Sequence, residues 1–138
     1  MGINEKLLSE AHKMLKYAYA PFSKFKVGAA LLDADGRIFT GCNVENASYG
    51  ACCCAERTAA VKAVSEGSRS FKAIAVVSGK GGETFPCGIC RQFLSEFSKD
   101  NDIAVILEKE NGEPVTYLLS ELLPHSFELE QNVNKQLK

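Results

Sequence analysis

The chain has 138 residues, of which 46% are hydrophobic and 24% are charged. These proportions are typical of one soluble globular domain and exclude a disordered or fibrous protein. Sixteen basic and seventeen acidic residues give a formal net charge of −1, which argues against nucleic acid as a partner and favours a small-molecule substrate. The N-terminus shows no secretory leader pattern and no apolar run reaches membrane-spanning length, so we expect a cytoplasmic protein with no membrane partner.

Predicted helices and strands alternate along the chain. Hydrophobic spacing predicts an amphipathic helix over residues 4–19 with Asn4 as its N-cap, and a β-hairpin over residues 26–42. A second helix is expected from Cys54 until Gly67 stops it. The later predicted elements are a strand over 72–78, a flexible glycine-rich loop over 79–86, a helix with a buried face at 90, 93, 94 and 97, strands over 103–107 and 115–118, and a short helix over 120–123.

This element order predicts the fold class. Helices interleaved with about five strands fit an α/β fold, a three-layer α-β-α sandwich on a five-stranded mixed sheet. Neither a linker nor an internal repeat divides the sequence. We therefore expect a single domain over residues 1–138, whose last ten or so residues form a mostly polar tail.

Six cysteines in a chain expected to stay in the cytoplasm indicate metal or redox chemistry rather than disulfides. Cys87 and Cys90 form a C-x-x-C pair at a predicted helix start, where residues three apart share one face. By itself, such a pair also fits a redox dithiol or two buried thiols. Cys54 stands at another helix start, where free N–H groups favour a thiolate. Three thiolates would leave one tetrahedral position of Zn²⁺ open, as catalytic sites do.

Glu56 is the candidate proton carrier beside this predicted site. Residues two apart on a regular helix do not share a face, so we expect Cys54 at or near the N-cap and Glu56 in the first turn. Three thiolates also bring more negative charge than Zn²⁺ neutralises. We expect Arg57 to donate a hydrogen bond to a ligand thiolate and offset that charge. Its alternative role is that of a solvated helix arginine.

Two segments carry a resemblance to a known family. Residues 54–58, Cys-Ala-Glu-Arg-Thr, and residues 86–91, Pro-Cys-Gly-Ile-Cys-Arg, are similar to the zinc-site motifs of the cytidine deaminases. Residues 21–30, with Pro-Phe-Ser, Phe25 and Val-Gly-Ala-Ala, and residues 43–47, Asn-Val-Glu-Asn-Ala, resemble the small homotetrameric members. The similarity extends over nearly the whole chain.

The resemblance implies an enzyme of pyrimidine salvage that hydrolyses cytidine and 2′-deoxycytidine to the uracil nucleosides and ammonia. It implies one Zn²⁺ per chain on Cys54, Cys87 and Cys90, with Glu56 acting first as base and then as acid. It further implies a cytidine deaminase-like fold. A homotetramer with sites shared between subunits is also implied.

The same resemblance assigns substrate contacts. Asn43 and Glu45 would bind the ribose hydroxyls, Phe25 would pack near the base, and backbone groups around Ala55 would read the pyrimidine edge. Phe127 would reach the site of a neighbouring subunit, with Tyr49 as a weaker candidate for such a contact. Each has an ordinary alternative: core packing for Phe25, a turn for Asn43, a solvated carboxylate for Glu45, and tail packing for Phe127.

The other cysteines and the histidines leave alternatives open. Cys52 and Cys53 precede Cys54, so spacing alone permits a slip of one or two residues in ligand choice. We expect Cys42, Cys52 and Cys53 to be small buried hydrophobes. The two histidines, His12 and His125, are assigned to structure or solvent.

Two other functions remain possible at this point. One keeps the metal and changes the substrate, to a blasticidin-type nucleoside or a polynucleotide. The other is a non-enzymatic zinc module in which Cys52 or Cys53 completes a four-cysteine site, although such a closed site has no use for Glu56.

Overall fold

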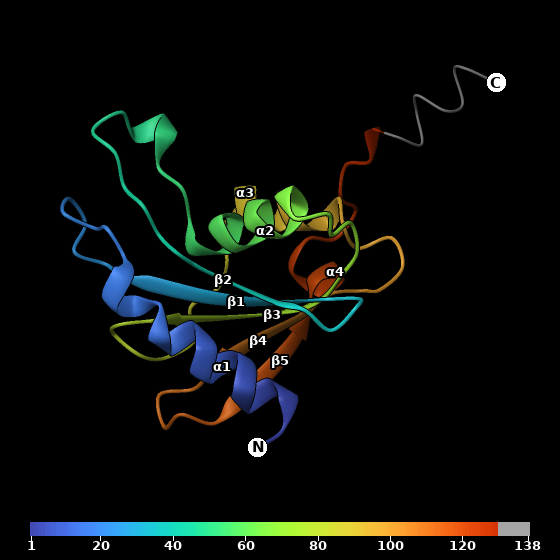
Figure 1. Ribbon diagram of the computed structural model, residues 1–138, viewed down its shortest axis with the longest axis horizontal. Helices are drawn as coiled ribbons and strands as arrows, with labels where there is room; N and C mark the ends of the chain where they lie inside the picture. Colours follow the sequence, from blue (N-terminus) through green and yellow to red (C-terminus); the bar gives the residue numbers. More distant parts are fainter. Residues whose placement is uncertain (130–138) are drawn as a thin grey trace.

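The computed structural model describes residues 1–129, so the predicted C-terminal tail lies outside the described residues. Five strands form one sheet in the order β2-β1-β3-β4-β5 (Figure 1). Only the β3–β4 pair is parallel, and the other pairs are antiparallel. The mixed sheet is therefore confirmed. Its strands are β1 (Val27–Asp33), β2 (Ile38–Cys42), β3 (Phe71–Ser78), β4 (Ala104–Glu108) and β5 (Pro114–Leu118).

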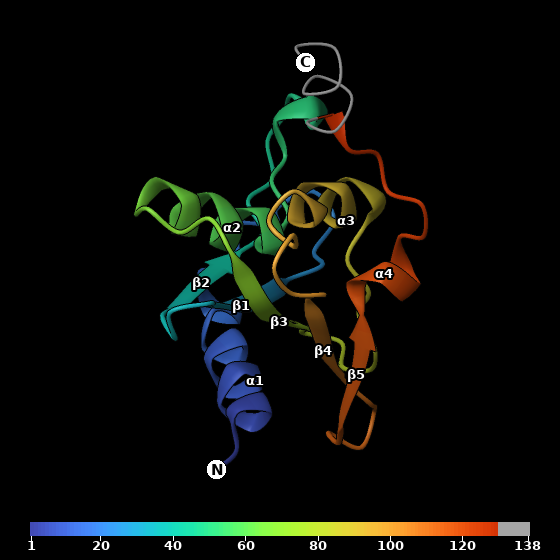
Figure 2. The same ribbon diagram turned by 90° about the vertical axis from the view of Figure 1, so that its right-hand side faces the viewer.

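Helices cover both faces of the sheet. α1 (Ile3–Lys13) lies against one face, and α2 (Ala55–Ser65) and α3 (Gly88–Ser95) lie side by side on the other (Figures 1 and 2). α4 (Leu119–Leu122) directly follows β5. Two short 3₁₀ helices span Leu15–Tyr17 and Tyr49–Ala51. The three-layer α-β-α sandwich is confirmed.

The central strands are buried on both faces because each face carries a helix layer. Leu31 and Ile74 belong to the hydrophobic cluster that also contains the buried alanines of α2 and Leu94 of α3. Ala30 and Ala75, the neighbours of those two residues along the strands, belong to the cluster beneath α1. Successive side chains of a strand point to opposite faces. The same short apolar runs therefore supply both layers of the core.

Two glycines on neighbouring strands let the helices approach the sheet closely. A Cβ atom added at Gly28 would lie 2.1 Å from the carbonyl oxygen of Ala11 in α1. A Cβ added at Gly41 would lie 2.5 Å from the backbone of both Ala55 and Ala59 in α2. The buried residues of α2 other than Glu56 are all alanines. This close packing fixes the N-terminal end of α2 against the sheet.

The first helix differs from its predicted bounds. It ends at Lys13 rather than near Tyr19, and Gly2, not Asn4, is its N-cap. Tertiary pairing keeps the helix from reaching Tyr19, because Tyr19 N donates to Asn43 O at 2.9 Å and Tyr19 O accepts from Glu45 N at 2.8 Å. This bridge requires extended backbone at Tyr19. The spacing of apolar residues within 4–19 carries no information about this pairing with a distant segment.

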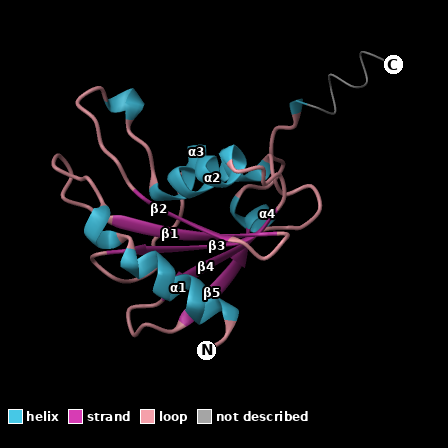
Figure 3. Cartoon of the chain, in the orientation of Figure 1, coloured by secondary structure: helices cyan, strands magenta, loops and turns pink. Residues whose placement is uncertain are grey.

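A long arm, residues 43–53, connects β2 to α2 and projects away from the sandwich (Figure 3). It is closed at its base by the antiparallel bridge between Val44 and Cys53. Tyr49 near its tip is 77% exposed. Throughout residues 1–129, the structure contains no helix of the length and apolarity needed to cross a membrane.

Candidate metal centre and active site

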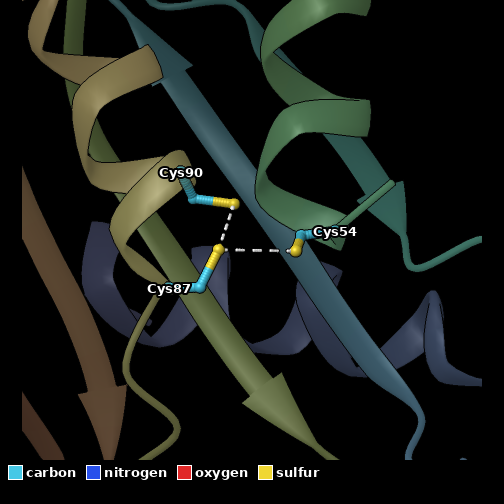
Figure 4. A group of neighbouring side chains, drawn as sticks. All are labelled: Cys54, Cys87 and Cys90. Atoms are coloured by element: carbon cyan, nitrogen blue, oxygen red, sulfur yellow. Dashed lines mark hydrogen bonds between the residues drawn. The ribbon is translucent and has the colours of Figure 1, made fainter. Parts of the chain in front are cut away.

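The N-termini of α2 and α3 meet above the sheet, and each begins with a cysteine. Cys54 is the N-cap of α2 and Cys87 is the N-cap of α3, while Cys90 lies within the first turn of α3. The three thiols point toward one another (Figure 4). The Cys54 and Cys87 sulfurs are 3.7 Å apart, and those of Cys87 and Cys90 are 3.5 Å apart.

These spacings fit a tetrahedral zinc ion. Zn–S bonds of about 2.3 Å place neighbouring tetrahedral sulfurs about 3.8 Å apart, close to the two observed distances. All three sulfurs lie within 4.8 Å of one another. Within the described part of the chain, this group of candidate ligands holds these three cysteines and no fourth residue. The set therefore leaves one tetrahedral position open, unlike a closed structural site.

The electrostatics of the thiols match a metal site. Hydrogen bonding from Cys90 and Arg57 lowers the pKa of Cys54 to about 5, although burial opposes the shift. The pKa of Cys90 is raised instead, by its hydrogen bond to Cys54 and by burial. One thiolate is thus stabilised before any metal arrives, and a dication would favour ionisation of the others.

Glu56 lies in the first turn of α2, as the sequence predicts for a residue two after the N-cap. Only 4% of its surface is exposed. Burial raises the pKa of Glu56 to about 7, and the nearby Cys54 thiolate adds to the shift. A carboxyl group with this pKa can both accept and donate a proton near neutral pH.

Arg57 reaches the metal ligands from the next position of α2. Its Nη2 donates to the Cys54 sulfur at 3.6 Å and to the Cys52 carbonyl at 3.3 Å. Its Nε is buried and has no hydrogen-bond partner among residues 1–129. The hydrogen bond to Cys54 raises the pKa of Arg57 above its ordinary value. The guanidinium is therefore charged and placed to draw negative charge from a thiolate.

A cavity of about 260 Å³ opens beside the cysteines. Cys54, Cys87 and Glu56 line it on the metal side. The residues expected to contact substrate within the same chain also line it: Phe25, Asn43, Glu45 and Ala55. An adjoining cavity of about 590 Å³ shares Cys54, Cys87, Asn43 and Glu45 and is also lined by Tyr49 and Arg57.

The polar residues of this cavity are held in place. Asn43 accepts from Val27 N at 2.9 Å and donates to Phe25 O at 2.7 Å. The Glu45 carboxylate accepts from the hydroxyl and backbone N–H of Ser23 and from Phe22 N at 3.0 Å. These bonds, led by the Ser23 hydroxyl, lower the pKa of Glu45. Glu45 is therefore an ionised acceptor at the cavity wall.

Phe127 does not line either cavity within its own chain. It is 61% exposed, and its carbonyl oxygen accepts from Gln92 Nε2 at 3.1 Å. Tyr49 lines the larger cavity and contacts Phe22 edge to face, with ring centroids 6.3 Å apart. The structure thus brings the expected residues together with one exception, Phe127.

The expectation for the extra cysteines is correct at one position and wrong at two. Cys42 is buried, which raises its thiol pKa. Cys52 and Cys53 are only half-buried and line the larger cavity, because the arm that carries them projects from the sandwich. Cys52 Sγ accepts from Asn46 N, and Cys53 Sγ accepts from the Thr58 hydroxyl. His12 pairs with Glu108 at 2.7 Å, a structural contact.

Four lining residues were not predicted as site residues from the sequence. Ser23, Val27, Thr84 and Phe85 also line the smaller cavity. Thr84 and Phe85 belong to a segment that the sequence suggested was only a flexible loop. Their position just before Pro86 and Cys87 is the signal that could have identified them.

Comparison with known proteins agrees with this site. A family model described as the cytidine and deoxycytidylate deaminase zinc-binding region matches residues 1–107. The chain belongs to this family. It is 49% identical over 126 residues to the cytidine deaminase of Sporosarcina psychrophila, covering 91% of this chain and 92% of that protein. The matched residues 1–107 include Cys54, Cys87 and Cys90, and membership of a zinc-binding deaminase family agrees with this three-cysteine cluster.

Solved structures show the same fold. The crystal structure of cytidine deaminase from Burkholderia pseudomallei has a TM-score of 0.83 and 46% identity, and covers 92% of this chain and 100% of that chain. The structure of cytidine deaminase from Mycobacterium tuberculosis has a TM-score of 0.79 and 38% identity, over 94% of this chain and 100% of that chain. The chain is therefore a zinc-site deaminase in fold and motif.

Proposed function

We propose that the protein hydrolyses cytidine and 2′-deoxycytidine to uridine and 2′-deoxyuridine with release of ammonia, as an enzyme of pyrimidine salvage. One observation carries the proposal: a buried carboxyl group, Glu56, shares a cavity of about 260 Å³ with Cys54 and Cys87 of the metal cluster. The relatives named cytidine deaminase support this choice of substrate.

The chemistry would divide between the metal and the protein. Zn²⁺ held by Cys54, Cys87 and Cys90 supplies the Lewis acidity that makes water reactive toward C4 of the base. Glu56 would take one proton from the attacking water and deliver it to N3 of the ring. It would then take the second proton of that oxygen, now bonded to C4, and deliver it to the departing amine as the C4–N bond breaks. A pKa near 7 suits both directions of transfer. The hydrogen bond from Arg57 to the Cys54 sulfur would offset part of the negative charge of the thiolates, so that the bound zinc ion keeps its Lewis acidity.

Substrate recognition would use the opposite wall of the cavity. The ionised Glu45 and the amide of Asn43 would hydrogen-bond the ribose hydroxyls, and Phe25 would pack near the base. Asn43 already bonds two backbone groups, but its amide nitrogen and oxygen can each make two hydrogen bonds. The formal net charge of −1 supports a free nucleoside over a polynucleotide, whose binding needs a cationic track.

The decisive experiment follows cytidine conversion to uridine by the zinc-loaded protein and by Glu56→Ala at equal zinc content. We expect turnover by the wild type and almost none by the variant. Glu66→Ala is a matched control, since Glu66 is an exposed glutamate at the C-terminal end of the same helix. No turnover by the wild type, or full turnover by Glu56→Ala, would contradict the proposal. Blasticidin S and a cytosine oligonucleotide test the two alternative substrates.

A homotetramer with shared sites belongs to the same proposal, as does the cytoplasmic location. The exposed Phe127 and Tyr49 support a site completed by a neighbouring subunit. Mixing inactive Glu56→Ala and Phe127→Ala chains tests this arrangement. If Phe127 acts across an interface, some sites in the mixture combine an intact Glu56 with a neighbour's intact Phe127, and activity rises above that of either variant. No rise would leave Phe127 as a packing residue.

A further inference from the structure

The segment 83–86, between the glycines after β3 and the start of α3, forms one wall of the catalytic cavity. Thr84 and Phe85 line this cavity, and the metal ligand Cys87 follows two residues after Phe85. Phe85 is 42% exposed, so burial alone holds its ring weakly. Something else must keep this wall in place.

Tyr117 makes two contacts with this segment. Its hydroxyl donates a hydrogen bond to the Glu83 carboxylate. Its ring packs on Phe85, with centroids 5.1 Å apart and planes tilted by 55°. The hydroxyl and the ring thus hold two residues on either side of Thr84.

Tyr117 itself belongs to the sheet. It lies on β5 opposite Val105 of β4, and its side chain packs against the hydrophobic cluster beneath α2 and α3. The end of the segment is fixed separately, because Arg91 Nε donates to Pro86 O at 2.8 Å. The cavity wall is therefore tied to the sheet through Tyr117 and to α3 through Arg91.

We propose that Tyr117 is a positioning residue for the deamination, which holds Phe85 and Glu83 so that the 83–86 wall fits the base of the substrate. This inference rests on the proposed function. Tyr117 lines neither cavity, so it acts through Phe85 rather than by touching the substrate. Glu56 lies in α2 and Cys54 is its N-cap, so both are carried by a different element from this wall.

This placement predicts a specific kinetic effect. A wall that contacts the base equally well in the bound substrate and in the transition state stabilises both states to the same extent. When such a wall is less well held, KM rises and kcat is unchanged. Tyr117→Phe removes only the hydrogen bond to Glu83, and we expect KM for cytidine to rise about threefold. Tyr117→Leu also removes the ring contact with Phe85, and we expect about tenfold. Zinc content should stay at the wild-type value in both variants.

The test is a double-mutant cycle on the full, zinc-loaded protein. Glu83→Ala should raise KM as much as Tyr117→Phe does, and the double variant should be no worse than either one. Glu83→Gln keeps a hydrogen-bond acceptor and should retain a KM near that of the wild type. Tyr17→Phe is the control, since Tyr17 is 63% exposed and lies beside α1. An unchanged KM in both Tyr117 variants, or strictly additive effects in the cycle, would overturn the inference.

Amide hydrogen exchange at Thr84, Phe85 and Cys87 separates this inference from the proposed function. We expect faster exchange at Thr84 and Phe85 in Tyr117→Phe with an unchanged Tm. If the wild type does not turn over cytidine, the proposed function fails, and exchange still decides the role of Tyr117. Exchange equal to that of the wild type would refute the positioning role whatever the activity.

Discussion

Two carboxylates are buried among residues 1–129, at opposite ends of the helix α2, and their surroundings differ. Asp33 at the end of β1 is 1% exposed, and Glu56 is 4% exposed. Asp33 accepts from Arg37 N at 2.8 Å, from Asp35 N at 3.1 Å and from Arg37 Nε at 3.2 Å. Burial alone would raise the pKa of Asp33, but these donors, with Ser68, lower it. For Glu56, burial prevails and the pKa rises to about 7.

The comparison shows that burial does not by itself identify a functional carboxylate. Asp33 is surrounded by donors that favour its charged form, so it stabilises the β1–β2 hairpin and has no proton to exchange at neutral pH. Glu56 lacks such a set and faces the thiolate of Cys54, so its two protonation states are close in free energy. The hydrogen-bond donors around each carboxylate thus explain why the pKa of Asp33 is lowered and that of Glu56 is raised. Under the proposed function, Asp33 is structural and Glu56 carries the proton.

The largest expected effect is the loss of proton transfer in Glu56→Gln. The amide keeps the size of the side chain but cannot take a proton, so kcat for cytidine should fall by about 10³-fold. Zinc per chain, measured by elemental analysis, should stay equal to that of the wild type. If Glu56→Gln keeps its turnover, Glu56 is not the proton carrier, and it does not differ from Asp33 in chemical role.

The same substitution should not destabilise the metal-free protein. Burial disfavours the charged form of Glu56, so a neutral amide relieves a cost that is present above the raised pKa of about 7. After zinc removal by a chelator, we expect the Tm of Glu56→Gln at pH 8 to equal or exceed that of the wild type. A lower Tm would mean that the charged Glu56 stabilises the fold, as Asp33 does.

Arg57→Gln should have the next largest effect. The variant loses the charged donor to Cys54, and we expect zinc affinity or turnover to fall by about 10- to 100-fold. Competition with a chromophoric chelator measures zinc affinity, and the rate of uridine formation measures turnover. Lys72→Gln removes a positive charge from an exposed position of β3 and serves as the control. If both zinc affinity and turnover persist in Arg57→Gln, Arg57 does not tune the site.

Asp33→Asn should affect stability rather than catalysis. Removing a buried charge that accepts several hydrogen bonds should lower the free energy of unfolding by about 2 kcal/mol at pH 7, measured with urea. The folded pKa of Asp33 lies below its unfolded value of about 3.9. Its contribution is therefore present above pH ~4 and is lost as the pH falls through the folded pKa.

The difference in free energy of unfolding between the wild type and Asp33→Asn should accordingly become smaller as the pH falls below about 4. Asp35→Asn, at an exposed position in the same turn, should change the free energy of unfolding much less. A gap between wild type and Asp33→Asn that is the same at pH 7 and at pH 2 would show that shape, not charge, makes Asp33 important. Turnover per zinc should be unaffected in either variant.

Ser68→Ala should give the smallest effect. It removes a single donor to Asp33 from a residue that is 4% exposed, and we expect a loss of about 1 kcal/mol with no change in kcat. A loss as large as that of Asp33→Asn would mean that one donor, rather than the whole set, holds this carboxylate.

Much of the site could be predicted because its chemistry is local. Helix N-termini stabilise thiolates, and each of Cys54 and Cys87 stands one residue before a helix. The same rule placed Glu56 in the first turn of α2. The roles of Asn43, Glu45 and Phe25 came from resemblance, and the structure adds that they share one cavity with Glu56.

The errors arose where distant segments decide the outcome. The first helix cannot extend to Tyr19 because Tyr19 pairs with the arm, and Cys52 and Cys53 stay half-exposed because that arm projects from the sandwich. No short-range pattern marks Asp33 as a buried carboxylate, since one of its hydrogen-bond donors, Ser68, is 35 positions further along the chain. Spacing rules concern neighbours within a helix or strand and cannot report such pairings.

The sequence by itself indicated the candidate cysteines, the candidate proton carrier and the α/β class, because helix ends and apolar periodicity are properties of short segments. Only the tertiary structure decided the strand order, the meeting of the two helix N-termini within sulfur–sulfur contact, and the contacts of Tyr117 with the cavity wall. It also decided the opposite pKa shifts of Asp33 and Glu56. Both the burial of a carboxylate and the hydrogen-bond donors around it depend on which distant residues pack together.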